Sequence, residues 1–134
     1  MKRYNALVSD THAVLYHAAG GRRLGPAAAT HFAACEEQTA ILYVPVAVIL
    51  EITLLARAGK LDLQRSPQRF FDDLFSNPAY QPMDLTPEQI YLAEEIRPNE
   101  DPFDALICAA ARSLDLPLLT HDAAIEESGM DVVW

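Results

Sequence analysis

Short apolar runs alternate with longer amphipathic segments along this chain, and the alternation predicts strands separated by helices. We expect strands over residues 4–9, 41–44, 116–120 and 130–134, with a short extended stretch over 80–84. We expect helices over residues 11–19, 26–37, 46–58, 66–75, 87–96, 103–114 and 123–127. Strands that alternate with helices are typical of a parallel sheet covered by helices on both faces. The predicted fold class is therefore α/β.

Glycine and proline mark several helix ends. Gly59 follows the third predicted helix, where glycine tolerates the backbone conformation that ends a helix, and Pro26 stands at a first helical position. The segment Thr86-Pro87-Glu88-Gln89 has the pattern of a capping box, in which the side chains of Thr86 and Gln89 satisfy each other's backbone N–H groups.

The length of 134 residues predicts one domain over residues 1–134, because such a chain buries roughly two-thirds of its unfolded surface. Hydrophobic residues make up 51% and charged residues 22%, which excludes long disordered stretches. Cys35 and Cys108 lack the spacing of a metal-binding motif, so we interpret them as reduced thiols. Polar residues interrupt the N-terminal apolar segment and no run has membrane-spanning length, so we expect a cytoplasmic protein that does not contact a membrane.

The net charge of −9 argues against binding nucleic acid through a broad basic surface. Four of the acidic residues, however, lie in apolar surroundings: Asp10, Glu51, Asp104 and Asp122. Burying an isolated carboxylate costs roughly several kcal/mol, and no Arg or Lys stands near any of them in sequence. A divalent cation such as Mg²⁺, which prefers oxygen ligands, would offset this cost. Two such ions would also reduce the net charge where a phosphate arrives.

Helix capping is the alternative explanation for several of these acids. Asp10 and Asp122 each follow a predicted strand and precede a helix, where Asp is a common N-cap. Asp101 fits a capping role better than a catalytic one, and Asp104 lies where the positive helix end would favour it. Glu51 is harder to explain, because its helical neighbours offer no partner. If the strands are parallel, Asp10 and Asp122 lie at the same sheet edge.

Several other residues are weaker candidates for the site. Thr11 and Thr120 are placed to donate to carboxylates or water, although threonine is common at strand ends. His12 and His121 flank the acids, and a solvated or capping histidine is the favoured interpretation. The loop over residues 20–25 carries two arginines, and we favour an ordinary solvated loop over a phosphate contact.

Taken together, the motifs resemble those of the PIN-domain family, and in particular the ribonuclease toxins of VapBC toxin–antitoxin pairs. The matching pieces, in order, are Ser9-Asp10-Thr11-His12, Val44-Pro45 with Glu51 and Gly59-Lys60-Leu61, Asp101-Pro102-Phe103-Asp104, Leu118-Leu119-Thr120-His121-Asp122, and Val132-Val133-Trp134. The match runs nearly end to end. One departure is Ala105, where such toxins often carry arginine after the second Asp, and it puts a substrate or antitoxin contact in doubt.

The resemblance implies a PIN-like three-layer α/β/α fold, with a central, mostly parallel sheet, and a cleft that binds Mg²⁺ or Mn²⁺. It implies that Asp10, Glu51, Asp104 and Asp122 are catalytic, with Asp101 accessory. We expect Asp10, Asp104 and Asp122 to ligate metal and Glu51 to orient or deprotonate water. The implied activity is hydrolysis of RNA phosphodiesters to a 3′-hydroxyl and a 5′-phosphate. A small antitoxin and a homodimer are implied as well, with the apolar segments 70–71, 74–75 and 49–55 as candidate contact surfaces or core.

Two other classes of function remain open. An Asp after the first strand is also found in phosphatases and phosphoacceptor domains. The haloacid-dehalogenase pattern requires a second Asp where this chain has His12, and the last lysine of the chain, Lys60, does not follow a late strand as a receiver domain requires. The third class is a PIN-like interaction module without catalysis, which the complete set of acids argues against.

Overall fold

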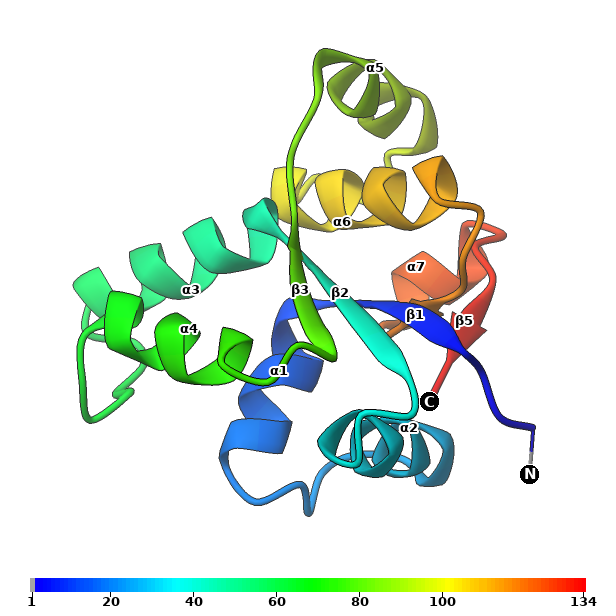
Figure 1. The fold of residues 1–134 in the computed structure, drawn as a ribbon. Coiled ribbons are helices and arrows are strands. Elements are labelled where there is room, and N and C mark those ends of the chain that lie inside the picture. Colours follow the sequence, from blue (N-terminus) through cyan, green and yellow to red (C-terminus); the bar gives the residue numbers. More distant parts are fainter. Residues whose placement is uncertain (1) are drawn as a thin grey trace.

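The computed structural model describes residues 2–134, which form a five-stranded parallel sheet covered by helices (Figure 1). The strands are β1 (Ala6–Ser9), β2 (Ile41–Pro45), β3 (Tyr80–Met83), β4 (Leu118–Leu119) and β5 (Val132–Val133). The helices are α1 (Thr11–Ala18), α2 (Pro26–Glu36), α3 (Val46–Arg57), α4 (Pro67–Phe75), α5 (Pro87–Ile96), α6 (Pro102–Ser113) and α7 (Ala123–Glu127). The predicted α/β class with a three-layer arrangement is confirmed.

The strand order β3-β2-β1-β4-β5 places β1 at the centre of the sheet. The chain builds outward from β1 through β2 to β3, and then returns to add β4 and β5 on the opposite side of β1. The order therefore reverses between β1 and β4, and ligands of open parallel sheets bind in the crevice beyond the carboxyl ends of the strands at such a reversal. Ser9 is in register with Leu119, so Asp10 and Thr120 leave the sheet at the same level.

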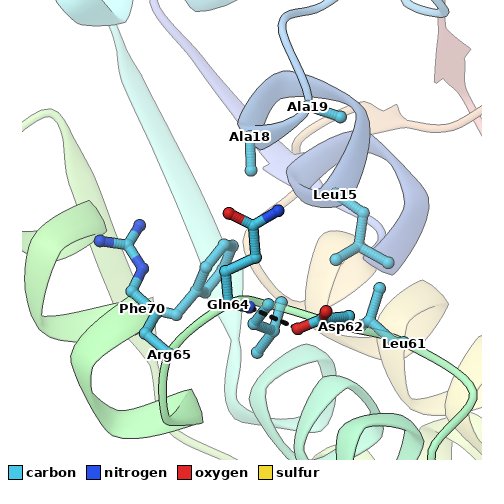
Figure 2. Close-up of a pocket in the computed structure, with 9 residues that line it drawn as sticks. Leu15, Ala18, Ala19, Leu61, Asp62, Gln64, Arg65 and Phe70 are labelled. Carbon is cyan, nitrogen blue, oxygen red and sulfur yellow. Dashed lines mark hydrogen bonds between the residues drawn. The ribbon is translucent and has the colours of Figure 1, made fainter.

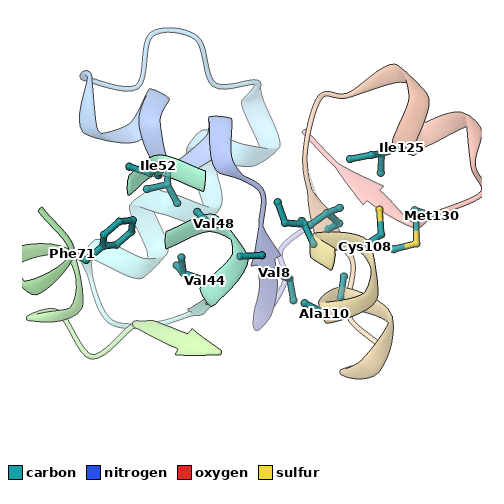
Figure 3. Close-up of a cluster of buried hydrophobic side chains, with 14 of the residues drawn as sticks. Val8, Val44, Val48, Ile52, Phe71, Cys108, Ala110, Ile125 and Met130 are labelled. Atoms are coloured by element: carbon teal, nitrogen blue, oxygen red, sulfur yellow. The ribbon is translucent and has the colours of Figure 1, made fainter. Parts of the chain in front are cut away.

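Both faces of the sheet are buried, which explains why the strands are continuous apolar runs. Val8, Val44 and Leu118 face one layer of helices, and Figure 3 shows part of this cluster, including Val48 and Ile52 of α3. Leu7 and Leu119, which neighbour Val8 and Leu118 in sequence, belong to a second cluster that also contains Leu42 of β2 and Ala28, Phe32 and Cys35 of α2. In β1 and β4, the alternation of side chains between the two clusters follows from the two-residue period of a strand.

The predicted elements all occur in the structure, with differences at their ends. The strands β4 and β5 are two residues each, shorter than predicted. Leu116 lies outside β4 because its backbone N–H donates to the carbonyl of Ala111, which closes the C-terminal turn of α6 (3.1 Å between N and O). Only half of the predicted capping box forms. Thr86 Oγ1 accepts from the backbone N–H of Gln89 (3.2 Å), but the Gln89 side chain donates to the carbonyl of Asp84 instead.

The structure also bears on the candidate contact segments and on the expected absence of a membrane span. Phe70 and Phe71 are buried in the core, so the core-packing interpretation holds for this candidate contact segment. Leu50 is half exposed on α3. Within residues 2–134, no helix has both the length and the apolar character needed to cross a bilayer.

A pair of substitutions on α3 tests the assignment of the core. Ile52 is fully buried whereas Leu50 is 50% exposed. We expect Ile52→Ala to lower the free energy of unfolding by about 2–5 kcal/mol, because it leaves a cavity. Leu50→Ala should cost less than about 1 kcal/mol. Urea unfolding of both variants gives the comparison, and equal losses would show that the buried face of α3 is wrongly assigned.

Candidate functional site

Asp10 lies at the carboxyl end of β1, beside β4, and only 6% of it is exposed. Its Oδ2 accepts a short hydrogen bond from the Thr120 hydroxyl (2.5 Å). Its Oδ1 accepts from the backbone N–H of Ala13 (2.8 Å), so Asp10 is also the N-cap of α1. The capping role and membership of an acidic site are therefore combined in one residue. Both bonds fix the orientation of this carboxylate at the reversal of strand order.

Asp122 is hydrogen-bonded to Thr120 as well. The backbone N–H of Asp122 donates to Thr120 Oγ1 (3.2 Å), and the Asp122 side chain accepts from Ile125 N as the N-cap of α7 (3.0 Å). Thr120 is almost fully buried. The expectation that Asp10 and Asp122 lie at one sheet edge is therefore confirmed, and the Thr120 hydroxyl links them.

Glu51 reaches the site from α3, where it is half-buried. Its own helix offers no partner, as the sequence indicates, but the Thr11 hydroxyl of α1 donates to Glu51 Oε1 (2.5 Å). Sequence spacing does not reveal this pair, because α1 and α3 come together only in the folded chain. Thr11 and Thr120 thus each donate to one of the predicted acids.

Asp104 lies in the first turn of α6 and is held by Asn99. The Asn99 side-chain amide donates to Asp104 Oδ2 (2.9 Å), while its Oδ1 accepts from the backbone N–H of Asp101 (2.8 Å). Asp101 caps α6 by accepting from Phe103 N (2.9 Å) and is exposed. The cap expected of Asp101 is therefore present. Asn99 is a site residue that the sequence analysis missed, since a polar residue in a loop carries no distinguishing pattern.

The pKa values show that the acids act on one another. Burial raises the pKa of Asp10, of Glu51 and of Asp104, and the hydrogen bonds from Thr120, Thr11 and Asn99 partly oppose it. Repulsion adds to the effect of burial: the charge of Asp104 raises the pKa of Asp10 and of Glu51, and that of Asp122 raises the pKa of Asp104. Asp104 is thus electrostatically coupled to each of the other three predicted catalytic acids.

Basic side chains do not neutralise this cluster. The ion pairs formed within residues 2–134 involve His17, Arg65 and Arg97 with acids elsewhere. A positive charge on the exposed His12 ring would lower the pKa of Asp10, Glu51 and Asp104, which places this ring near all three. The four carboxylates therefore repel one another without an arginine or lysine among them.

The donor set fits a hard divalent cation in its chemistry, since it consists of carboxylate oxygens and places them at a ligand-binding edge of the sheet. The four carboxylates are farther apart, however, than the ligands of a bound metal ion would be. Within residues 2–134, no three His, Cys, Asp or Glu side chains stand close enough together to hold a metal ion. Repulsion and the separate donors Thr11, Thr120 and Asn99 explain this spacing, because each donor holds one carboxylate in its own place.

Ala105, which departs from the toxin pattern, packs between α5 and α6. It is buried in a small cluster with Ala93 of α5 and Ala109 of α6. Many contacts join these two helices, and small residues let helix backbones approach closely. Position 105 therefore lies on the face of α6 that packs against α5.

A hollow of about 540 Å³ lies away from the four predicted catalytic acids (Figure 2). Figure 2 shows Leu15, Leu61 and Phe70 around it, together with the polar residues Gln64 and Arg65. None of the predicted site residues lines this hollow. Size alone therefore does not identify the functional site of this chain.

This chain is similar to known proteins both in sequence pattern and in fold. A model of the PIN domain family matches residues 7–129. No curated protein sequence gives a significant match. Among solved structures, the chain is similar to VapBC2 from Rickettsia felis bound to a DNA fragment from their promoter (13% identity, TM-score 0.69, 96% of this chain and 97% of that chain covered).

Two further structures show the same likeness. One is a toxin–antitoxin complex from Klebsiella pneumoniae (17% identity, TM-score 0.64, 96% of each chain covered). The other is FitAcB from Neisseria gonorrhoeae (15% identity, TM-score 0.61, 96% of each chain covered). At these identities the likeness shows a shared fold.

The raised pKa values predict how stability changes with pH in the absence of divalent cations. Asp104 keeps its proton to higher pH in the folded protein than its ordinary pKa of 3.8 allows, so the folded state binds more protons than the unfolded state. Stability should therefore fall as pH rises from this value through the raised pKa. Asp104→Asn removes this contribution, and we expect it to raise the unfolding temperature in EDTA at pH 7.

Asp72→Asn is the control for this variant, because Asp72 is exposed on α4. It removes the same charge from the chain but should leave the unfolding temperature nearly unchanged. Thermal unfolding of both variants in EDTA at several pH values provides the measurement. A clear loss of stability in Asp104→Asn at pH 7 would contradict the electrostatic account.

Proposed function

The chain belongs to the PIN domain family, and on this premise we propose that it is a divalent-metal-dependent endoribonuclease and the toxin of a toxin–antitoxin pair. The observation that carries the proposal is the set of coupled carboxylates at the reversal of strand order, with no arginine or lysine among them in residues 2–134. Such a set repels an RNA phosphate unless cations intervene. Mg²⁺ or Mn²⁺, which accept oxygen ligands, are the cations proposed for this role.

Asp10, Asp104 and Asp122 are the proposed metal ligands, and Thr120 and Asn99 hold two of them in place. When bound, a divalent cation supplies a charge that polarises the phosphoryl oxygen and lowers the pKa of water. Asp104 and Asp122 each accept a hydrogen bond at one carboxylate oxygen, and Asp10 accepts one bond at each of its two oxygens, so every oxygen accepts at most one. Oxygen lone pairs therefore remain available at all three residues.

Glu51 is the proposed group that orients or deprotonates the attacking water. Burial raises its pKa above the ordinary 4.5, and repulsion from Asp101 and Asp104 adds to this effect. A carboxylate with a raised pKa is a stronger base, and general-base catalysis favours a pKa nearer the working pH. Thr11 fixes one oxygen of Glu51, so the other is available to accept a proton. Asp101 remains accessory, through its effect on Glu51 and Asp104.

The structures of similar fold support a protein partner. Two of them are described as toxin–antitoxin or VapBC assemblies, and this chain covers nearly their whole length. We propose by analogy that a small antitoxin binds this protein and that the toxin works as a homodimer in the cytoplasm, as one domain over residues 1–134. RNA is the proposed substrate, since the family resemblance points to ribonuclease toxins.

Two competing functions make different predictions. A phosphatase or phosphoacceptor would use Asp10 as a nucleophile, but His12 stands where the haloacid-dehalogenase pattern requires a second Asp. An interaction module without catalysis would not require four coupled acids. Release of inorganic phosphate from small esters, with RNA left intact, would favour the phosphatase.

The principal test is cleavage of a fluorogenic single-stranded RNA with Mg²⁺, Mn²⁺ or EDTA. We expect cleavage by the unaltered protein with either cation and none in EDTA. Asp10→Asn should lower kcat/KM by about 100-fold or more, because it removes a proposed ligand, while circular dichroism shows the fold intact. Asp72→Asn is the matched control and should retain activity. Full activity of Asp10→Asn would refute its assignment.

Thr120 allows a second test, of positioning. Thr120→Val removes the hydroxyl bound to Asp10 and Asp122 with little change in shape. We expect kcat/KM to fall about 10–100-fold and the Mg²⁺ concentration for half-maximal activity to rise, because a residue that orients a ligand carries such effects. Thr120→Ser should restore most activity. Thr53→Val, whose hydroxyl bonds only within α3, is the control. An unchanged Mg²⁺ dependence of activity in Thr120→Val would show that Thr120 does not position a metal ligand.

A further inference from the structure

A pocket of about 190 Å³ lies directly beside the acidic site. Asp10 and Asp122 form part of its wall, and every other residue that lines it carries a ring: His12, Tyr16, His121 and Trp134. The pocket is several times larger than the roughly 30 Å³ that a water molecule occupies in the liquid. Four rings thus gather next to the proposed catalytic acids.

The rings form one connected set. His121 stacks on Trp134 with nearly parallel planes (13°) and 5.4 Å between centroids. Tyr16 meets Trp134 edge-on at 6.2 Å, and His12 lies 5.8 Å from Tyr16. His12 and His121 are exposed, so part of this ring surface is accessible to a ligand.

Trp134 is held firmly in its position. Its carbonyl accepts a hydrogen bond from the backbone N–H of Ala28 (2.8 Å). A Cβ atom at Gly25 would lie 2.5 Å from Trp134 Cδ1, so only glycine permits this close approach. The end of the loop over residues 20–25 is thereby packed against Trp134, while Arg22 and Arg23 are exposed.

This loop brings a positive charge to the rings. The Arg23 guanidinium lies over the Tyr16 ring, 4.6 Å from its centroid. Arg23 is exposed, as expected of a solvated loop, and it also contacts this ring. A cation beside a ring-lined pocket matches the two parts of a nucleotide, since the phosphate attracts the guanidinium and the base stacks on rings.

We propose that this pocket binds the unpaired base of a nucleotide next to the scissile phosphate, with His121 and Trp134 as its stacking surface and Arg23 near the adjoining phosphate. The inference rests on the proposed function, because it specifies single-stranded RNA as the substrate. Bases of a duplex are stacked within the helix and cannot enter a pocket, whereas unpaired bases stack on aromatic side chains. Stacking also tolerates different bases, because each has a flat π-face.

Trp134 is the only tryptophan of the chain and reports on the pocket directly. We would titrate Glu51→Gln protein, with Mg²⁺ present, with a single-stranded RNA hexamer and follow Trp134 fluorescence. Glu51 is the proposed water-activating group and not a proposed metal ligand, so this variant should bind cation and RNA without cutting the RNA. We expect saturable quenching, and an affinity about tenfold weaker for a hexamer with an abasic nucleotide at the stacking position or after His121→Ala is added.

Matched variants and a matched RNA sharpen the test. His121→Phe should restore binding, because phenylalanine keeps a flat ring. Tyr91→Ala removes a strongly exposed ring outside the pocket and should change nothing. A hairpin RNA of the same strand sequence should bind at least about tenfold more weakly than the hexamer. Equal binding of intact and abasic hexamers, or the same loss in His121→Ala and Tyr91→Ala, would overturn the proposal.

Cleavage assays on the protein without substitutions separate this inference from the proposed function. If RNA is cleaved but an abasic nucleotide at each position near the cut leaves kcat/KM unchanged, the ribonuclease stands and the base pocket is wrong. If the hexamer quenches Trp134 as expected but no RNA is cleaved with either cation, the pocket stands and the nuclease assignment is wrong.

Discussion

Repulsion among carboxylates at one edge of the sheet is the constraint on which the rest of this structure depends. Asp104 is coupled to Asp10, Glu51 and Asp122, and burial already raises the pKa of three of these four groups. A protein gains no stability from such an arrangement, because each buried charge without a counter-charge costs free energy. The cost is understandable if the site works with a cation that the four side chains recruit together.

The fold explains how residues far apart in sequence reach this edge. Parallel pairing of β1 with β4 brings Asp10 beside Thr120, although 110 positions separate them. The starts of three helices then orient acidic side chains at this edge, since Asp10, Asp101 and Asp122 each cap the helix that follows them. Capping and catalysis are thus compatible, because a cap engages one carboxylate oxygen and leaves lone pairs for a ligand. The three donors Thr11, Thr120 and Asn99 each hold one of the acids in a fixed orientation.

The sequence predicted the elements well because their signals are local. Apolar runs, Pro26 and Gly59 mark strands and helix ends within a few neighbouring residues, and all twelve elements were predicted to within a few positions. The candidate acids were found because charges in apolar runs are rare. Side-chain partners were harder: Glu51 is bound by Thr11 from another helix, and Asn99 lies in a loop without a pattern. The ring-lined pocket was missed for the same reason, since Tyr16, His121 and Trp134 meet only after the chain folds.

Binding of Mn²⁺ measured by calorimetry in buffers of different ionisation enthalpy tests the central claim most directly. If the coupled carboxylates form the cation site, Mn²⁺ binds the protein and releases protons near and below the raised pKa values, because the ion displaces protons from these groups. Asp104→Asn should then bind Mn²⁺ far more weakly. Binding of equal strength in both proteins, or no proton release at any pH, would contradict the account.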